Sequence, residues 1–122
     1  MLVAGIVLVL VGVLVVVITE LAASGRLGIN SIAGLRFGAM LASDEGWTVG
    51  HRAARVPLDL AGVALVIAGL IYLVVPMTDG VSVLVVIGAM VFTLAMVAIA
   101  AVVGNRAATQ VLLRMIAEGE LS

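Results

Sequence analysis

The polar side chains of this chain that could do chemistry are few, and they lie at the ends of long apolar runs or between two such runs. They are Glu20, Asn30, Arg36, His51, Arg52, Asp59 and Arg106. Amide, imidazole, guanidinium and carboxyl groups can together bind a ligand or a protein partner through hydrogen bonds and ion pairs. If the apolar runs are helices, their ends and the connecting segment bring these groups to one face. We therefore predict a polar cluster on that face as the candidate site.

The same residues give little reason to expect catalysis or metal binding. The chain has no cysteine and a single histidine, so it lacks the ligand sets of protein-built zinc and haem sites. His51 or Asp59 could serve as an acid–base group acting on lipid, but no recognisable nucleophile–base pair accompanies them. We expect a protein that is not an enzyme and that uses no cofactor or metal.

The composition predicts an integral membrane protein. Of the 122 residues, 65% are hydrophobic and 11% are charged, and the mean hydropathy is +1.42. Soluble domains are about 45–50% apolar and about 25% charged, so water would not solvate a surface built from this chain. The net charge of −1 gives no reason to expect direct binding to nucleic acid.

Three apolar runs are long enough to cross a bilayer, which takes roughly 20 residues of helix. We predict an all-α fold with transmembrane helices at about 2–20, 57–75 and 81–103, forming a single membrane domain. Residues 21–56 then form a loop, and residues 104–122 form a tail. We expect the first span to be retained rather than cleaved as a signal peptide, because its apolar run is long and no basic residue precedes it.

The placement of the basic residues predicts the orientation of the spans. All of them are arginines, and all lie in the loop or the tail. An odd number of spans puts these two segments on the same side, which the positive-inside rule makes cytoplasmic, with the N-terminus outside. Ionisable residues near the middle of a bilayer usually mark ion paths, and this sequence places none there. We therefore do not expect a pump or a proton-coupled transporter.

Each predicted span carries small residues seven positions apart. They are Gly5 and Gly12, Gly62 and Gly69, and Gly88 and Ala95. Such a stripe allows another helix backbone to approach closely, although Gly and Ala are also simply common in membrane helices. The stripes are candidate docking faces for a partner protein or for a second copy of the chain. The second and third spans should form an antiparallel hairpin, because only a short turn beginning at Pro76 joins them.

The second half of the loop predicts an amphipathic helix at the membrane interface. Ser43 is suited to cap it, and the two acids that follow favour the positive end of the helix dipole. We place Trp47 on the apolar side of this helix, at the level of the lipid headgroups, and His51 and Arg52 on the polar side. A further amphipathic helix is predicted in the tail after Gly104, where it could lie on the membrane or dock a partner.

The charged residues at the ends of the spans have simple predicted roles. Pro57 suits the first turn of the second span, so Asp59 would stand near the third position and cap free N–H groups there, or else bind a ligand. An acid at a helix C-terminus opposes the dipole, so we expect Glu20 to face a loop arginine. Arg106 could extend to a lipid phosphate or pair with either acid.

The loop contains, in order, Asn30, Gly34-Leu35-Arg36, Ser43-Asp44-Glu45 followed by Trp47, and His51-Arg52. This order resembles the signature of the SdpI family of small bacterial membrane proteins, which precedes a membrane span. The resemblance implies a ligand or partner site whose residues are Asn30, Gly34, Arg36, Trp47, His51 and Arg52.

The chain departs from the usual family pattern just after Arg36. Members generally have Thr at the positions of Phe37 and Met40, and often a basic residue at the position of Gly38. A family site that needs those hydroxyl groups and that charge would be altered or lost here.

The resemblance implies a function as well as a site. Family members are associated with immunity to a secreted, membrane-damaging toxin, and with holding a transcriptional repressor at the membrane as a signal. We therefore expect a multi-pass protein of the bacterial plasma membrane that acts through its cytoplasmic loop in toxin immunity or membrane sensing. The alternative is a small accessory subunit of a larger membrane complex. We expect membrane lipid and a protein partner as its contacts, with homo-oligomers as a further option.

Overall fold

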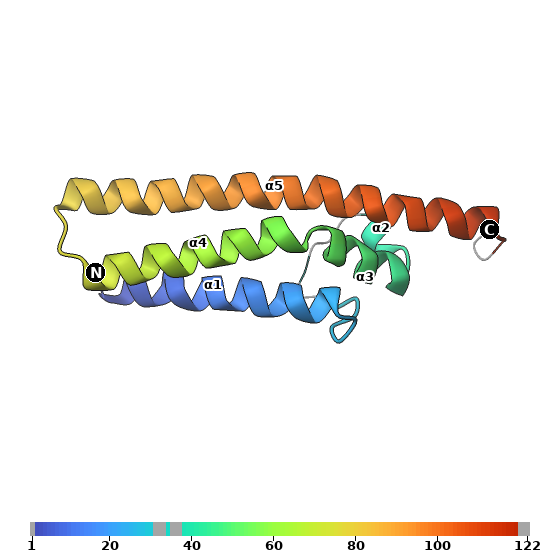
Figure 1. The fold of residues 1–122 in the computed structure, drawn as a ribbon, viewed down its shortest axis with the longest axis horizontal. Coiled ribbons are helices and arrows are strands. Elements are labelled where there is room, and N and C mark those ends of the chain that lie inside the picture. The colour runs from blue at the N-terminus through green and yellow to red at the C-terminus, as the bar shows by residue number, and fades with distance from the viewer. Residues whose placement is uncertain (1, 31–33, 35–37, 120–122) are drawn as a thin grey trace.

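The computed structural model describes residues 2–30, 34 and 38–119, and this part of the chain is helical without strands (Figure 1). The helices are α1 (Leu2–Ala23), α2 (Gly38–Leu41), α3 (Asp44–Ala53), α4 (Arg55–Val74) and α5 (Asp79–Ala117). Of these, α1, α4 and α5 are long and apolar enough to cross a membrane, as the sequence predicts. The first turn of α1 lies beside the connection between α4 and α5, and the last turn of α5 lies at the opposite end of the molecule.

Helices α1 and α4 pack directly against each other through their glycines. A Cβ atom added to Gly62 would lie 2.8 Å from the carbonyl oxygen of Gly12, and one added to Gly69 would lie 2.8 Å from that of Gly5. No side chain fits in this space, so the two antiparallel backbones are in contact at two levels about two turns apart. The predicted glycine stripes of the first and second spans are therefore used within the chain. Gly88 in α5 differs, because nothing lies within 4 Å of its Cβ position.

Helix α4 lies between the other two long helices (Figure 1). It packs against α1 on one side and α5 on the other, whereas α1 and α5 have no pair of Cα atoms within 8 Å. The α4–α5 connection contains Pro76, and Thr78 begins α5 by accepting a hydrogen bond from the N–H of Val81 at 3.3 Å. The predicted antiparallel hairpin is thus present, with a capped entry into its second helix.

Helix α5 is a single helix of 39 residues. At about 1.5 Å per residue it is roughly 58 Å long, about twice the thickness of the hydrocarbon core of a bilayer. The helix predicted after Gly104 is present, but it is not a further element, because the third span continues through that glycine without a break. Ala108 and Val111 are buried, so the inner face of this extension is covered by protein.

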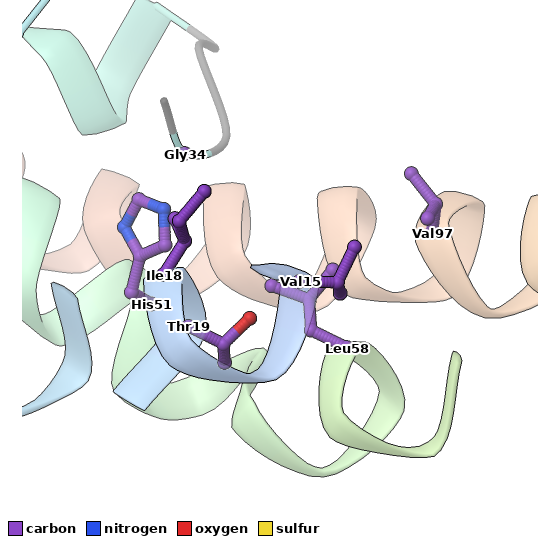
Figure 2. Close-up of a pocket in the computed structure, with 7 residues that line it drawn as sticks. All are labelled: Val15, Ile18, Thr19, Gly34, His51, Leu58 and Val97. Atoms are coloured by element: carbon purple, nitrogen blue, oxygen red, sulfur yellow. The ribbon is translucent and has the colours of Figure 1, made fainter. Parts of the chain in front are cut away.

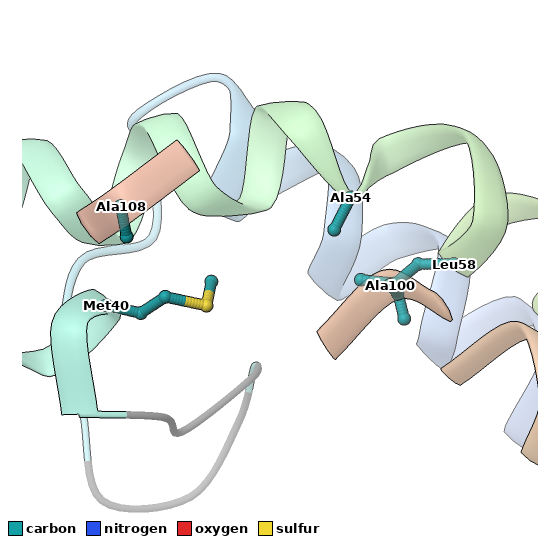
Figure 3. Packing of buried hydrophobic residues seen from close by; sticks show 5 residues of the cluster. All are labelled: Met40, Ala54, Leu58, Ala100 and Ala108. Carbon is teal, nitrogen blue, oxygen red and sulfur yellow. The ribbon is translucent and has the colours of Figure 1, made fainter. Parts of the chain in front are cut away.

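The end of α5 that carries the C-terminus packs against α2 and α3 (Figure 3). The buried cluster at this contact consists of Met40, Ala54, Leu58, Ala100 and Ala108. Met40 lies between two glycines: a Cβ on Gly50 would be 2.6 Å from its Cε, and one on Gly104 would be 3.4 Å from its sulfur. The same Gly104 Cβ would lie 3.0 Å from the carbonyl oxygen of Gly50. A third glycine contact therefore sets the distance between α3 and α5.

Replacing Gly12 by leucine is expected to lower the midpoint of thermal unfolding of the purified protein in mild detergent. The new side chain would overlap the backbone of α4, and overpacking of this kind typically costs about 1–3 kcal/mol. Gly88→Leu is the matched control, since its side chain enters open space. Equal midpoints for the two variants would contradict the role given to the α1–α4 contact.

Candidate functional site

Two side chains of α3 bind the end of α1 and the segment that directly follows it. The indole Nε1 of Trp47 donates a hydrogen bond to the carbonyl oxygen of Leu27 at 2.8 Å. Nε and Nη2 of Arg52 both donate to the carbonyl oxygen of Ala23, each at 3.2 Å. The last carbonyl groups of a helix have no partner within it and carry partial negative charge, so a guanidinium group there is favourable. These bonds hold α3 at the end of the first span.

Trp47 and His51 form the centre of the site. Both are 0% exposed, and their ring centroids lie 4.4 Å apart with the planes inclined at 48°. Nδ1 of His51 lies 2.8 Å from the carbonyl oxygen of Trp47. A carbonyl oxygen only accepts hydrogen bonds, so Nδ1 is the protonated nitrogen of the neutral ring.

The prediction that Trp47 and His51 lie on opposite sides of α3 is wrong. Positions four apart lie on the same side of a helix, so Trp47 and His51 share one face. That face points into the protein, with Ser43 capping the helix through a 2.9 Å bond from the N–H of Gly46. Trp47 therefore lies in the interior rather than among lipid headgroups, and His51 is not on the polar side. Arg52 lies on the exposed side, as predicted.

Gly34 closes the site over the two rings. Its φ angle is +101°, and an added Cβ would lie 2.6 Å from Cη2 of Trp47 and 2.9 Å from Nε2 of His51. Both the backbone conformation and the lack of space require glycine at this position. A glycine, a tryptophan and a histidine from separate parts of the loop are therefore packed into one contact.

The other predicted loop residues do not join this cluster in the same way. Asn30 is half-buried, and its Nδ2 donates to the carbonyl oxygen of Gly28 at 2.9 Å, which stabilises a local turn. Arg36 and Phe37 lie outside the described residues. Gly38 begins α2, and Met40 is a core residue between α3 and α5. At that position the chain uses an apolar side chain for packing.

The acidic residues at the span ends form a second cluster, around Arg55. Nε of Arg55 lies 2.6 Å from one carboxylate oxygen of Glu20, and Nη2 lies 3.0 Å from the other. This confirms that Glu20 faces a loop arginine. Asp59 contacts the same Glu20 side chain. The prediction that Asp59 caps the helix is wrong, because α4 begins at Arg55 and Ala54 is its N-cap residue.

Arg106 is separate from both clusters. It is exposed on α5, and among the described residues it makes no ion pair with Glu20 or Asp59. The ion pair that connects α5 to the loop is instead between Arg114 and Glu45, at 2.6 Å. Sequence analysis missed this pair because its members are 69 positions apart.

A cavity of about 200 Å³ lies beside the Trp47–His51 pair (Figure 2). Its lining residues are Val15, Ile18, Thr19, Gly34, His51, Leu58 and Val97. The walls come from all three long helices, and the hydroxyl of Thr19 and the imidazole of His51 are its polar side chains. Thr19 was not predicted as a site residue, since a single threonine near the end of an apolar run carries no distinct signal.

The electrostatics of the site favour a neutral histidine. Burial lowers the pKa of His51 below its ordinary value of 6.5, and the hydrogen bond to the Trp47 carbonyl offsets part of this effect. Within the described residues no group of three or more His, Cys, Asp or Glu side chains could hold a metal ion. The arrangement can hold the loop in place and accept an apolar group beside a weakly polar end.

Comparison with known proteins gives one match. The family model described as the SdpI/YfhL protein family matches residues 26–105, which include most of the loop, α4 and most of α5. No curated protein and no solved structure matches the chain.

Acidification is expected to loosen the loop through His51. Between its lowered folded pKa and 6.5, the unfolded loop binds more protons than the folded one, so loop stability is full above pH 6.5 and falls as the pH drops through this window. Trp47 is the single tryptophan of the chain and contacts the titrating ring. Its fluorescence should therefore weaken and shift to longer wavelength, with a midpoint below pH 6.5.

The control for this titration is His51→Gln, which keeps a polar side chain but cannot titrate near neutral pH. Its emission should not change over the same pH range. A transition of equal size in both proteins would show that another group causes the effect.

Proposed function

We propose that this chain, which belongs to the SdpI/YfhL protein family, is a non-enzymatic protein that protects the cell against a membrane-active agent or senses the state of the membrane. It is a membrane protein of that family with three helices suited to span the bilayer. In the proposal, its loop is the part that acts on a partner. The loop and the C-terminal part of α5 face the cytoplasm of a bacterial cell, as the placement of the arginines favours.

The proposal rests on one observation, which is that residues of the family signature contact one another in the folded loop. Gly34, Trp47 and His51 make one interlocked contact, and Trp47 and Arg52 attach it to the end of α1. These residues shape a folded loop rather than presenting a nucleophile or a metal set. Such a construction suits a recognition surface better than a reaction centre.

The contacts of α3 support a link between the spans and the loop. This short helix touches α1, α4 and α5. A change in how the long helices pack therefore reaches the loop directly, through contiguous packed side chains. In the proposal, an agent that disturbs the membrane alters this packing, and the loop surface changes for its partner.

Deletion of the protein is expected to make cells more sensitive to a membrane-active peptide, and complementation with matched glycine variants tests the loop. Gly34→Ala should fail to restore survival, because its Cβ would overlap Trp47 and its φ angle is unfavourable for alanine. Gly28→Ala should restore it, since nothing lies within 4 Å of that Cβ position. Equal amounts of each variant in the membrane must be verified by immunoblot. An unchanged survival curve after deletion would exclude the immunity form of the proposal.

The second candidate is an accessory subunit of a larger membrane complex. It is favoured by α5, in which Gly88 is open and only 6% of the residues of the most apolar stretch are buried within the chain. The glycines of α1 and α4 are already in contact with each other, so this face of α5 is the one left to dock a partner protein or a second copy.

Affinity purification in mild detergent with Gly88→Leu and Gly80→Leu variants distinguishes this second candidate. A stoichiometric membrane partner, or a second copy, that is lost with Gly88→Leu and kept with Gly80→Leu would support it. Both glycines are open to their surroundings, so neither change should disturb the fold. A monomer without a stoichiometric partner would exclude it.

A further inference from the structure

The cavity beside His51 has the form of a binding site for part of an amphiphile. Its walls are the aliphatic side chains of Val15, Ile18, Leu58 and Val97, and among the described residues no charged side chain lines it. The side chains of Thr19 and His51 are buried, at 2% and 0% exposure, and both contribute to one end (Figure 2). The polar end lies at the last turns of α1, and the apolar walls extend toward the middle of the spans.

The arrangement of the long helices gives this cavity access from the membrane. Helix α4 contacts both of its neighbours, but α1 and α5 do not approach each other. Val15 and Ile18 lie on α1 and Val97 lies on α5, so the cavity is between the two helices that remain apart. In a bilayer the space between such helices is reached by acyl chains rather than by water.

We propose that this cavity binds a segment of one lipid acyl chain, with the carbonyl end of the chain at the hydroxyl of Thr19, beside His51, and the methylene groups between Val15 and Val97. The choice of an acyl chain rests on the polarity of the walls. A hydroxyl donor at one end and aliphatic groups elsewhere match an acyl ester or acid. The volume of about 200 Å³ is below the roughly 300–1,000 Å³ of sites for whole drug-sized ligands. The site therefore takes part of one chain and leaves the headgroup outside.

The occupied cavity would sit directly beneath the loop. Gly34 and His51 line the cavity and also contact Trp47. An acyl chain in the cavity thus lies one side chain away from the indole ring. This inference does not depend on the immunity or sensing role, since it rests on the cavity and on the separation of α1 from α5.

Trp47 provides the test, because it is the single tryptophan and is fully buried. The full chain is reconstituted in nanodiscs of phosphatidylcholine whose acyl chains carry bromine, a contact quencher of indole fluorescence. The bromine is placed near the ester end in one preparation and near the methyl end in another. We expect stronger quenching from bromine near the ester end, since that end of the chain lies at His51.

Two variants from different helices fill the cavity, and each has a matched control on the outer surface. Val97→Phe is compared with Val91→Phe, and Val15→Phe with Val13→Phe; Val91 and Val13 are 61% and 47% exposed. The filling variants should lose at least half of the ester-end quenching, and the controls should keep it. The wavelength of Trp47 emission without bromine shows in each case whether the loop is still folded.

The same experiment has two further outcomes, and each of them would overturn the proposal. Equal quenching in filling and control variants would show that only lipid around the outside reaches Trp47, and absence of quenching would show that no chain enters; either result overturns the proposal. A brominated free fatty acid, added to nanodiscs of unbrominated lipid, distinguishes the source. Quenching by the fatty acid alone would assign the site to free acids, and quenching by the phospholipid would assign it to bilayer lipid.

Discussion

Direct contact between helix backbones at glycine is the constraint on which the rest of this structure depends. Within a membrane, apolar side chains gain nothing by leaving lipid for protein, so association relies on close van der Waals contact. Gly12 meets Gly62 in this way, Gly5 meets Gly69, and Gly50 meets Gly104 in the loop region. The first two contacts fix α1 against α4, and the third fixes α3 against α5. Since α4 also packs on α5, these contacts determine where every other element lies.

The loop site follows from this placement. Once α1 and α3 are held, the carbonyl oxygen of Ala23, at the end of α1, accepts hydrogen bonds from Arg52, and that of Leu27, in the segment after it, accepts one from Trp47. Gly34 then covers the rings of Trp47 and His51 on one side, and His51 also lines the cavity between the long helices. The loop, although polar, therefore has buried side chains of its own, with the neutral imidazole of His51 among them.

Much of the fold could be predicted from the sequence, because long apolar runs and capping residues are local signals. The three long helices and the Ser43 cap belong to this class. The site was harder to predict. The residue type of Trp47 suits an interface and so predicts a place on the lipid side, whereas its actual environment depends on Gly34, which is distant in sequence. Asp59 was placed at a cap because Pro57 suggested the helix start, but the helix begins at Arg55 without a side-chain cap. The Arg114–Glu45 ion pair depends on α5 continuing past Gly104, which helix propensity alone does not indicate.

The length of α5 has a mechanical consequence. A rigid rod that is partly embedded and partly projecting converts a change in bilayer thickness, which membrane helices accommodate by tilting, into a sideways displacement of its free end. From Gly104 to Ala117 the helix extends for about 20 Å, so a tilt of about 10° moves its end by about 3.5 Å. That displacement is comparable to the length of the Arg114–Glu45 ion pair, at 2.6 Å. Because Gly50 and Gly104 hold α3 against this part of α5, a thinner or thicker bilayer would displace α3 together with the projecting end of the helix.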